Sequence, residues 1–168
     1  MFDSTVLGVD PGVSALGVAV VTRRDGGCEI LSCATVRTPV KRAEADRLRL
    51  IHEAVVDAIT AHRPDAVAVE RIAWNKNHVS ALAVARATGV VLLAASQAGL
   101  PVEEYGPLEV KMAVTGQGTS DKARVRDALT KLHGLADVPD EPDAADAVAV
   151  AICHLAQSRL RRMQRLAT

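Results

Sequence analysis

Aromatic residues, net charge and long apolar runs are scarce or missing in this sequence. Its 168 residues include one Phe, one Trp and one Tyr, and 20 basic side chains balance 20 acidic ones. The most apolar stretch, ATGVVLLAA, is about half as long as a membrane span requires. The first residues, MFDSTVLGVD, carry an acid where a secretory signal peptide would be basic. These absences exclude membrane and secreted classes and predict a cytoplasmic protein.

The cysteines and the chain length narrow the class of protein further. Cys28, Cys33 and Cys153 are odd in number and form no CxxC pair, which favours reduced thiols over a disulfide framework. A chain of 168 residues with 49% hydrophobic content can bury a substantial core. We therefore expect a single domain over residues 1–168, with residues 157–168 as a tail that can fray. The zero net charge argues against nucleic-acid binding unless the acids are concentrated in a metal site.

The order of predicted elements indicates the fold class. Strands are expected at residues 5–10, 16–23 and 28–37, broken by PGVSA and RDGG, so the chain begins as an antiparallel meander. A helix at 42–62, a strand at 65–70, a helix at 79–99 and a strand at 101–106 follow. A short helix at 108–114, a glycine loop and helices from Asp121 and Pro142 complete the chain. This βββαβαβ order with terminal helices predicts an α/β fold, a mixed five-stranded sheet with helices on both faces.

Two acids at the start of the last expected helix are unusual. In DEPDAADAVAVAICH, Asp143 and Asp146 lie three residues apart on one helix face, where like charges repel. Acids in a first turn after Pro142 also favour the helix dipole, which explains Asp143 well. Every residue from 147 to 153 is small or apolar, so Asp146 faces packed protein on most sides. A capped, solvated helix start and a metal site both remain open from this stretch alone.

Two further acids end predicted strands. Asp10 closes VLGVD before Pro11 and Gly12, and Glu70 closes AVAVE. An isolated acid after a buried strand is usually only the first exposed residue. Taken together with the two helix acids, they form four carboxylates whose formal charge two divalent cations would match. Mg²⁺ binds through one or two carboxylates plus waters and substrate phosphates, and paired ions support in-line phosphoryl displacement.

The segments LGVDPG, AVERI, VTGQGTSDK and DAADAVAVAICH, in this order, resemble the RuvC family of Holliday junction resolvases, within the ribonuclease H-like nuclease superfamily. The resemblance runs from Val6 to about His154. It implies a ribonuclease H-like fold and a homodimeric, Mg²⁺-dependent endonuclease, with Mn²⁺ as a substitute metal. Such an enzyme nicks two opposed strands of a four-way DNA junction symmetrically, in recombination and DNA repair. The family works with a junction-recognition protein and a branch-migration motor.

The resemblance also assigns roles to residues. The catalytic, metal-binding acids carry over onto Asp10, Glu70, Asp143 and Asp146. Asp10 would bridge two ions, Glu70 would share one of them, and the two helix acids would hold the other. Positions that contact DNA phosphates match Lys111 and Lys122. Further candidates for DNA contact are Arg71, Lys76 and Arg124.

Three segments admit more than one interpretation. TGQGTSDK suits backbone contact with a phosphate, or else it is a turn with Thr119 or Ser120 as the helix cap. A stripe of small residues in the helix at 79–99 lets another helix approach, within the fold or across a dimer axis: Ala81, Ala85, Thr88 and Gly89. The family's aromatic wedge position is Ala73 here, so its neighbour Trp74 is the candidate DNA wedge, with burial in the core as the alternative.

Other functions remain as alternatives. One is a junction-binding protein without catalysis, against which the four acids argue. A second is a related nuclease of the same superfamily that acts on structured RNA. A sugar-kinase or actin-like domain shares the strand and turn GVDPG but requires a longer chain. The five histidines show no ligand spacing.

Overall fold

The computed structural model describes residues 4–25, 27–71 and 78–166, and the side chains of residues 78–80 and 159–166 are not described. Its strands are β1 Ser4–Asp10, β2 Ala15–Arg24, β3 Gly27–Arg37, β4 Ala66–Glu70 and β5 Val102–Tyr105. Its helices are α1 Glu44–His62, α2 His78–Gln97, α3 Pro107–Thr115, α4 Lys122–Lys131 and α5 Pro142–Leu166. The strands and helices follow one another in the predicted order.

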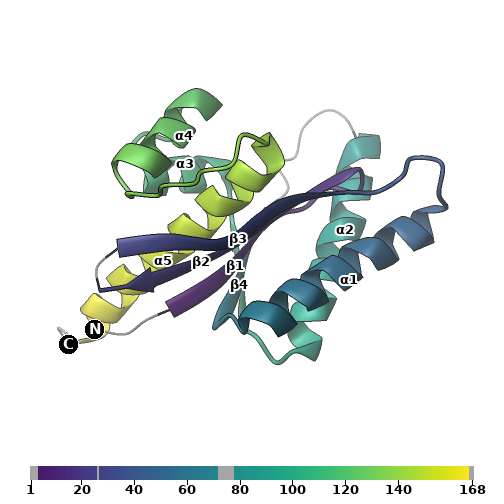
Figure 1. Cartoon of the computed structure of the whole chain (residues 1–168), viewed down its shortest axis with the longest axis horizontal. Helices are drawn as coiled ribbons and strands as arrows, with labels where there is room; N and C mark the ends of the chain where they lie inside the picture. Colours follow the sequence, from purple (N-terminus) through teal and green to yellow (C-terminus); the bar gives the residue numbers. More distant parts are fainter. Residues whose placement is uncertain (1–3, 26, 72–77, 167–168) are drawn as a thin grey trace.

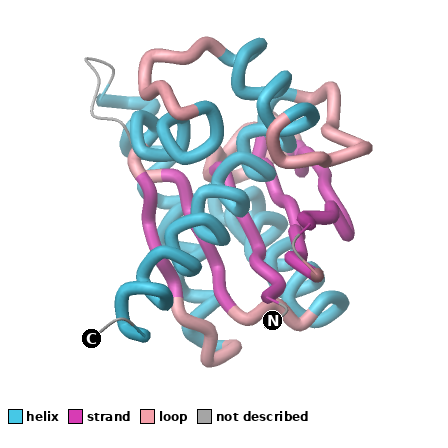
Figure 2. The backbone as a smooth tube through the Cα atoms, turned by 90° about the vertical axis from the view of Figure 1, so that its left-hand side faces the viewer, coloured by secondary structure: helices cyan, strands magenta, loops and turns pink. Residues whose placement is uncertain are grey.

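The strands form one mixed sheet in the order β3-β2-β1-β4-β5. β1 pairs antiparallel with β2 and parallel with β4, and β4 pairs parallel with β5. Figure 1 shows α5, with α3 and α4 beside it, on one face of this sheet and α1 with α2 on the other. The tube view in Figure 2 shows the same layering from the side, with helices in front of and behind the strands. The predicted fold class is confirmed.

Alternation along the strands divides the core into two layers. On β1, Val6 packs with the α3–α5 cluster, while Leu7 and Val9 pack with the α1–α2 cluster. On β4, Ala68 faces the first cluster and Val67 the second. Successive side chains of a strand point to opposite faces, so central strands covered on both sides read as continuous apolar runs. This is why the predicted strands VLGVD and AVAVE lack polar alternation.

Small residues bring α5 unusually close to the sheet. A Cβ added at Gly8 would lie 2.2 Å from the Ala147 carbonyl oxygen, and one at Gly17 would lie 1.9 Å from the Asp143 carbonyl oxygen. Neither position leaves room for a side chain. Gly17 is the register partner of Asp10 in the β1–β2 ladder. The helix that carries two of the predicted acids therefore lies directly against the strand position beside a third.

The observed ends of two helices can be compared with the predicted ones. The first helix begins at Glu44 rather than at residue 42. The last helix begins at Pro142, as predicted, and continues to Leu166, so the end of the chain is helical over most of residues 157–168. Fraying of that tail stays a prediction. Within the described residues, no helix is both long enough and apolar enough to cross a membrane.

Candidate active site

Two of the four predicted acids lie side by side at the carboxyl ends of parallel strands. β1 and β4 pair in the register Val9 with Val69, which places Asp10 next to Glu70 one residue further on. Each acid is partly buried and ends its strand. The carboxyl ends of strands in an open α/β sheet are where ligands usually bind. The two carboxyls are near enough that the charge of Glu70 and its hydrogen bonding with Asp10 both raise the pKa of Asp10.

The other two acids reach the same place from α5. Asp143 is in the first turn of the helix and Asp146 follows three residues later, so both lie on the face toward the sheet end. The negative charges of both raise the pKa of Asp10, which shows that all four carboxyls are near enough to interact. The four acids that a linear sequence spreads over 137 residues thus meet at one end of the sheet.

Burial and neighbouring acids both act on the Asp10 carboxyl. Burial raises the pKa of its carboxyl from 3.8 to about 8, with the charge of Glu70 as the next cause. Burial also raises the pKa of Glu70, although its hydrogen bond with Asp10 and the positive charge of Lys122 work in the opposite direction. Desolvation and like charge both disfavour the ionised forms. A positive ion bound between these groups would reverse that balance.

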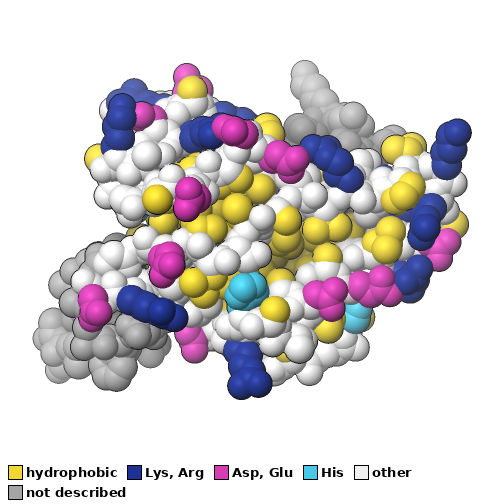
Figure 3. Space-filling model, viewed as in Figure 1, with side chains coloured by type: hydrophobic (Ala, Val, Ile, Leu, Met, Phe, Trp, Pro, Cys, Tyr) yellow, Lys and Arg dark blue, Asp and Glu magenta, His cyan; other side chains and the backbone are white. Residues whose placement is uncertain are grey.

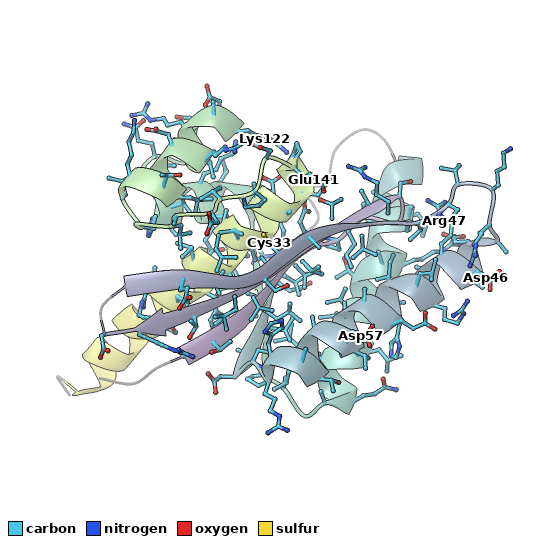
Figure 4. All side chains as sticks on the ribbon, in the orientation of Figure 1. Cys33, Asp46, Arg47, Asp57, Lys122 and Glu141 are labelled. Carbon is cyan, nitrogen blue, oxygen red and sulfur yellow. The ribbon has the colours of Figure 1, made fainter. Side chains whose placement is uncertain are left out.

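Lys122 supplies a positive charge at the edge of this cluster. Its Nζ donates to Asp146 Oδ2 at 2.6 Å, which joins α4 to α5. Figure 4 labels Lys122 on the side of α4 that faces the beginning of α5. This hydrogen bond raises the pKa of the Lys122 ammonium group, while partial burial lowers it. The Lys122 side chain is 71% exposed, so it is free to swing toward solvent or a ligand. The predicted DNA-binding lysine is therefore an ion-pair partner of a predicted metal-binding acid.

A cleft opens beside the acids. Its volume is about 240 Å³, and its charged lining consists of Glu70, Asp146, Lys111 and Lys122. The remaining lining is contributed by Pro107, Val110, Val125 and Ala149. α3 and α4 therefore form one wall and α5 the other. A negatively charged group that entered this cleft would meet two lysines and, with bound cations, the acids behind them.

The four acids suit Mg²⁺, which does not require a closed cage of protein ligands. Among the residues that the structure describes, no three His, Cys, Asp or Glu side chains are arranged to hold one ion by themselves. Mg²⁺ seldom needs such an arrangement, because it keeps several waters and binds through one or two carboxylates together with substrate phosphate. Pairs of carboxylates on one side of an open cleft meet that requirement. The donor set supports this fit, because four carboxylates meet at this end of the sheet and the negative charges of the other three raise the pKa of partly buried Asp10.

Of the remaining predicted DNA contacts, two lie among the described residues and two lie outside them. Arg71 is exposed directly after Glu70, and its guanidinium donates to the Glu104 carbonyl oxygen at 3.1 Å. Arg124 is exposed on the first turn of α4, close to Lys122. Trp74 and Lys76 lie outside the described residues, so their roles as wedge and phosphate contact stay predictions. On the face shown in Figure 3, basic and acidic side chains are interspersed.

Two features of the segment TGQGTSDK bear on its two interpretations: the conformation of Gly116 and the cap of α4. Gly116 ends α3 with φ of 75°, a left-handed conformation that glycine adopts without strain. The cap of α4 is Asp121, whose Oδ1 accepts from the Arg124 N–H at 2.8 Å, so Thr119 and Ser120 were wrong as cap candidates. Because the Asp121 carboxylate occupies the helix N-terminus, it disfavours a phosphate at the backbone there, and backbone contact of this loop with a phosphate stays a prediction.

Gly17 is the residue that inspection of motifs missed. It does not touch a ligand, but its lack of a side chain lets the Asp143 backbone approach Asp10. The available signal was a glycine within the strand LGVAVV, because an interior strand glycine often marks a close backbone approach. The sequence could not show which backbone approaches it.

Comparisons with known proteins agree with the motifs. The family model described as "Crossover junction endodeoxyribonuclease RuvC" matches residues 6–154. A curated protein of that name from Halothermothrix orenii is 41% identical over 157 residues, covering 94% of this chain and 95% of its own. Another, from Parafrankia sp., is 44% identical over 167 residues, covering 97% and 92%.

Solved structures show the same relationship. A structure of Thermus thermophilus RuvC in complex with Holliday junction substrate matches with a TM-score of 0.88 and 35% identity, covering 94% of this chain and 96% of that one. The yeast mitochondrial Holliday junction resolvase matches with a TM-score of 0.72 at 12% identity, over 97% and 84% of the two chains, and shares the fold. The profile match over most of the sequence and the identities above 40% place this chain in the RuvC family of crossover junction endodeoxyribonucleases.

Proposed function

We propose that this protein is a structure-selective endonuclease that resolves four-way DNA junctions by paired, symmetric nicks. The observation that carries the proposal is the meeting of four carboxylates from β1, β4 and α5 beside a cleft lined by two lysines. This arrangement suits a reaction in which a phosphodiester enters an acidic, cation-binding site. A related structure contains Holliday junction substrate, which supports the choice of DNA junction over structured RNA.

Nucleases of this family are metal-dependent, and we propose Mg²⁺ as the metal, with two ions per site. Asp10 and Glu70 would hold one ion and Asp143 with Asp146 the other, with Asp10 shared between them. When bound, such ions polarise the phosphoryl oxygens and make a water a better nucleophile. Mn²⁺ should substitute, since carboxylate and water ligands suit both ions.

The chain's own residues prepare the site. Asp10 must lose the proton that burial and Glu70 stabilise on this pair, so the acids shed a proton before they can serve as full ligands. Lys122 must leave Asp146 for that carboxylate to be available, and its exposed ammonium group then contacts the DNA backbone. Lys111, on the same wall of the cleft, gives a second positive charge toward the scissile strand. Arg71, Arg124, Lys76 and Trp74 extend the proposed DNA contact outward.

The proposed homodimer rests on the exposed face of α2. Leu82 is 54% exposed, Leu93 is 52% exposed and Leu92 is 36% exposed, all on this one helix. A Cβ added at Gly89 would touch nothing within 4 Å, so close packing inside this chain does not explain the glycine, although its neighbour Thr88 is buried. A second α2 across a two-fold axis would cover that surface and place two sites against two strands of a junction. A junction-recognition protein and a branch-migration motor are the further partners that we propose.

Asp146→Asn is the sharpest test of this function because it keeps the side-chain shape and removes one charge. With Mg²⁺ and labelled DNA, we expect nicking of a four-way junction to fall by orders of magnitude, while junction binding in Ca²⁺ survives. Asp140→Asn is the matched control, because Asp140 is exposed near the same helix start but pairs with Arg126.

The unsubstituted protein should nick a four-way junction far faster than linear duplex or structured RNA. Full nicking by Asp146→Asn would remove this acid from the site. Preferential cleavage of the RNA substrate would replace the proposed function with the superfamily alternative.

A further inference from the structure

A buried tyrosine and histidine join β5 to α5. The Tyr105 hydroxyl is 2.9 Å from His154 Nδ1, within hydrogen-bonding distance, and the two rings meet edge to face with centroids 5.9 Å apart. Tyr105 is 2% exposed and His154 is 8% exposed. Polar side chains that are this well buried are kept only when they are paired, because an unpaired one is costly.

Two more side chains join α3 to α5, one turn further along α5. Glu109 Oε1 accepts from Gln157 Nε2 on α5 at 2.7 Å, and Glu109 Oε2 accepts from the Gly106 N–H at 3.3 Å. Glu109 thus uses both carboxylate oxygens, one for its own helix cap and one for α5. With Tyr105 and His154, it completes a set that we name the polar clamp: Tyr105, Glu109, His154 and Gln157.

Each side of the polar clamp continues directly into the active site. Tyr105 is the register partner of Glu70 in the β4–β5 ladder, and its carbonyl oxygen accepts from the Arg71 N–H at 2.8 Å. On the other side, His154 follows Asp146 on α5 by about 12 Å of helix axis at 1.5 Å per residue. The clamp therefore connects the strand end that carries Glu70 to the helix that carries Asp146.

Apolar packing and directional polar contacts both act on the position of α5 along its axis. Its buried face toward β1 is built from small side chains such as Ala147 and Ala151 packed over Gly8. Hydrophobic burial is non-directional, whereas a hydrogen bond requires a defined distance and angle. Two directional contacts, at Tyr105–His154 and Glu109–Gln157, add a defined distance and angle to the axial position that this packing favours.

We infer that the polar clamp positions α5 along its axis so that Asp146 stands at the correct separation from Glu70 for metal binding. Its members are positioning residues: they act through Glu70 and Asp146 and touch neither DNA nor metal. Because α3 carries both Glu109 and Lys111, the clamp also sets where that lysine enters the cleft. The inference rests on the proposed function, since it assumes that these acids bind a metal ion.

The test compares Tyr105→Phe with Thr22→Val. Tyr105→Phe keeps the ring and removes the clamp hydroxyl. Thr22→Val removes a buried hydroxyl from β2 that is 3.1 Å from Thr5 Oγ1. Both variants are titrated with Mn²⁺ without DNA, and free Mn²⁺ is followed by its electron paramagnetic resonance signal. Thermal unfolding of each protein in EDTA measures the loss of stability.

We expect Tyr105→Phe to weaken Mn²⁺ binding by about tenfold, the lower end of what losing an outer-shell partner costs a metal site. Thr22→Val should bind Mn²⁺ as the unsubstituted protein does, at a comparable loss of stability. In nicking assays, Tyr105→Phe should need more Mg²⁺ for half-maximal rate and recover most of the rate when metal saturates. Glu109→Gln, which keeps one acceptor oxygen, should show a smaller effect of the same sign.

Unchanged Mn²⁺ affinity in Tyr105→Phe, or equal weakening in both variants, would reduce the polar clamp to a contribution to core stability. If Tyr105→Phe does not fold, Glu109→Gln and Gln157→Leu make the same comparison from the other end of the clamp. Failure of the proposed function has a separate signature, because the unsubstituted protein would then neither bind Mn²⁺ at the acids nor nick a junction.

Discussion

Asp10 shows at the level of one residue how a site for cations is prepared by the fold. The strand β1 carries it into a partly buried position, and three other acids are placed around it. Removing water from a carboxylate and adding like charges both disfavour ionisation. The pKa of the Asp10 carboxyl is therefore raised to about 8, so folding favours its protonated form in a pH range where the unfolded chain is ionised.

The first prediction is a pH dependence of stability that belongs to Asp10. The pKa of its carboxyl is 3.8 when free and about 8 in the fold, so between these values the unfolded state binds fewer protons. Stability in EDTA should therefore fall as pH rises from about 4 to about 8. Asp10→Asn should flatten this slope and raise the Tm at pH 8, by about 2–4 °C for each kcal/mol of repulsion relieved.

Thermal unfolding at several pH values checks this, and other titrating groups cancel in the comparison of the two proteins. Mg²⁺ should restore the stability of the unsubstituted protein at pH 8 but stabilise Asp10→Asn much less. Parallel slopes in EDTA would mean that the Asp10 carboxyl is ionised in the fold after all.

The second prediction at the level of one residue concerns Lys122, whose two proposed roles have opposite effects on binding. Its ammonium group competes with a metal ion for Asp146, and it attracts DNA. Lys122→Met removes the ammonium group bound to Asp146 but keeps an unbranched side chain. Without DNA, Mn²⁺ should bind this variant more tightly, since no internal cation competes for the carboxylate. Junction binding should weaken, and the slope of log affinity against log salt should become shallower by about one.

Mn²⁺ titration and salt-dependent binding of a labelled junction measure the two effects separately. Lys131→Met is a suitable control, because Lys131 is an equally exposed lysine that pairs with Asp127 at the other end of α4. An unchanged salt slope in Lys122→Met would return this residue to the solvated surface.

At the level of elements, the decisive contact is that of α5 with the sheet. α5 packs over Gly8 and Gly17 with no room for a Cβ at either, and Gly17 is paired with Asp10. The approach lets a helix N-terminus carry Asp143 to the end of β1. A larger residue at this strand position must displace either the helix or the strand.

The third prediction therefore concerns Gly17→Ala. The added methyl would lie 1.9 Å from the Asp143 carbonyl oxygen, so the beginning of α5 must move away. We expect a loss of stability of about 1–3 kcal/mol, as for other overpacked positions, together with weaker Mn²⁺ binding. Denaturant unfolding and the Mn²⁺ titration are the measurements.

Gly27→Ala provides the control on the neighbouring strand, where an added Cβ would meet only the Arg24 carbonyl oxygen at 3.8 Å. It should change neither Mn²⁺ binding nor nicking. Wild-type metal affinity in Gly17→Ala would show that the separation of Asp143 from Asp10 is not critical.

At the level of the whole molecule, the exposed apolar face of α2 is the feature that the isolated chain does not explain. Leu82 and Leu93 are each more than half exposed on a helix whose opposite side is buried in the α1–α2 core. A patch of this kind on a monomer usually marks an interaction site. A second copy of the chain is the partner that the proposed paired cleavage requires.

The fourth prediction is that Leu93→Glu separates the dimer. Sedimentation should change from dimer to monomer, because a charge buried at a helix interface is costly without a partner. On a plasmid with an extruded cruciform, this variant should leave nicked circles where the unsubstituted protein yields linear DNA. Leu132→Glu is the matched control, since Leu132 is 70% exposed at the end of α4. A dimeric Leu93→Glu variant would place the interface elsewhere.

Much of this architecture was predictable because it depends on local patterns. The order of strands and helices follows from apolar runs and turn residues, and the start of α5 at Pro142 follows from helix-start preferences. The cap of α4 was mispredicted because Thr119, Ser120 and Asp121 are all good caps, and only the backbone path selects Asp121. The hydrogen bond of His154 with Tyr105 was not predictable in this way, because it depends on the packing of α5 against β5.

The sequence by itself determined which acids are available, which strands end in them and which family the motifs resemble, because these properties are carried by residues adjacent in the chain. Only the tertiary structure decided that the pKa of Asp10 is raised, that Lys122 is bound to Asp146 and that Gly17 allows α5 to approach the sheet closely. Each of these depends on distances between segments more than 20 residues apart. Desolvation, ion pairing and close packing act through space, so they exist only once β1, β4, α4 and α5 have been brought together.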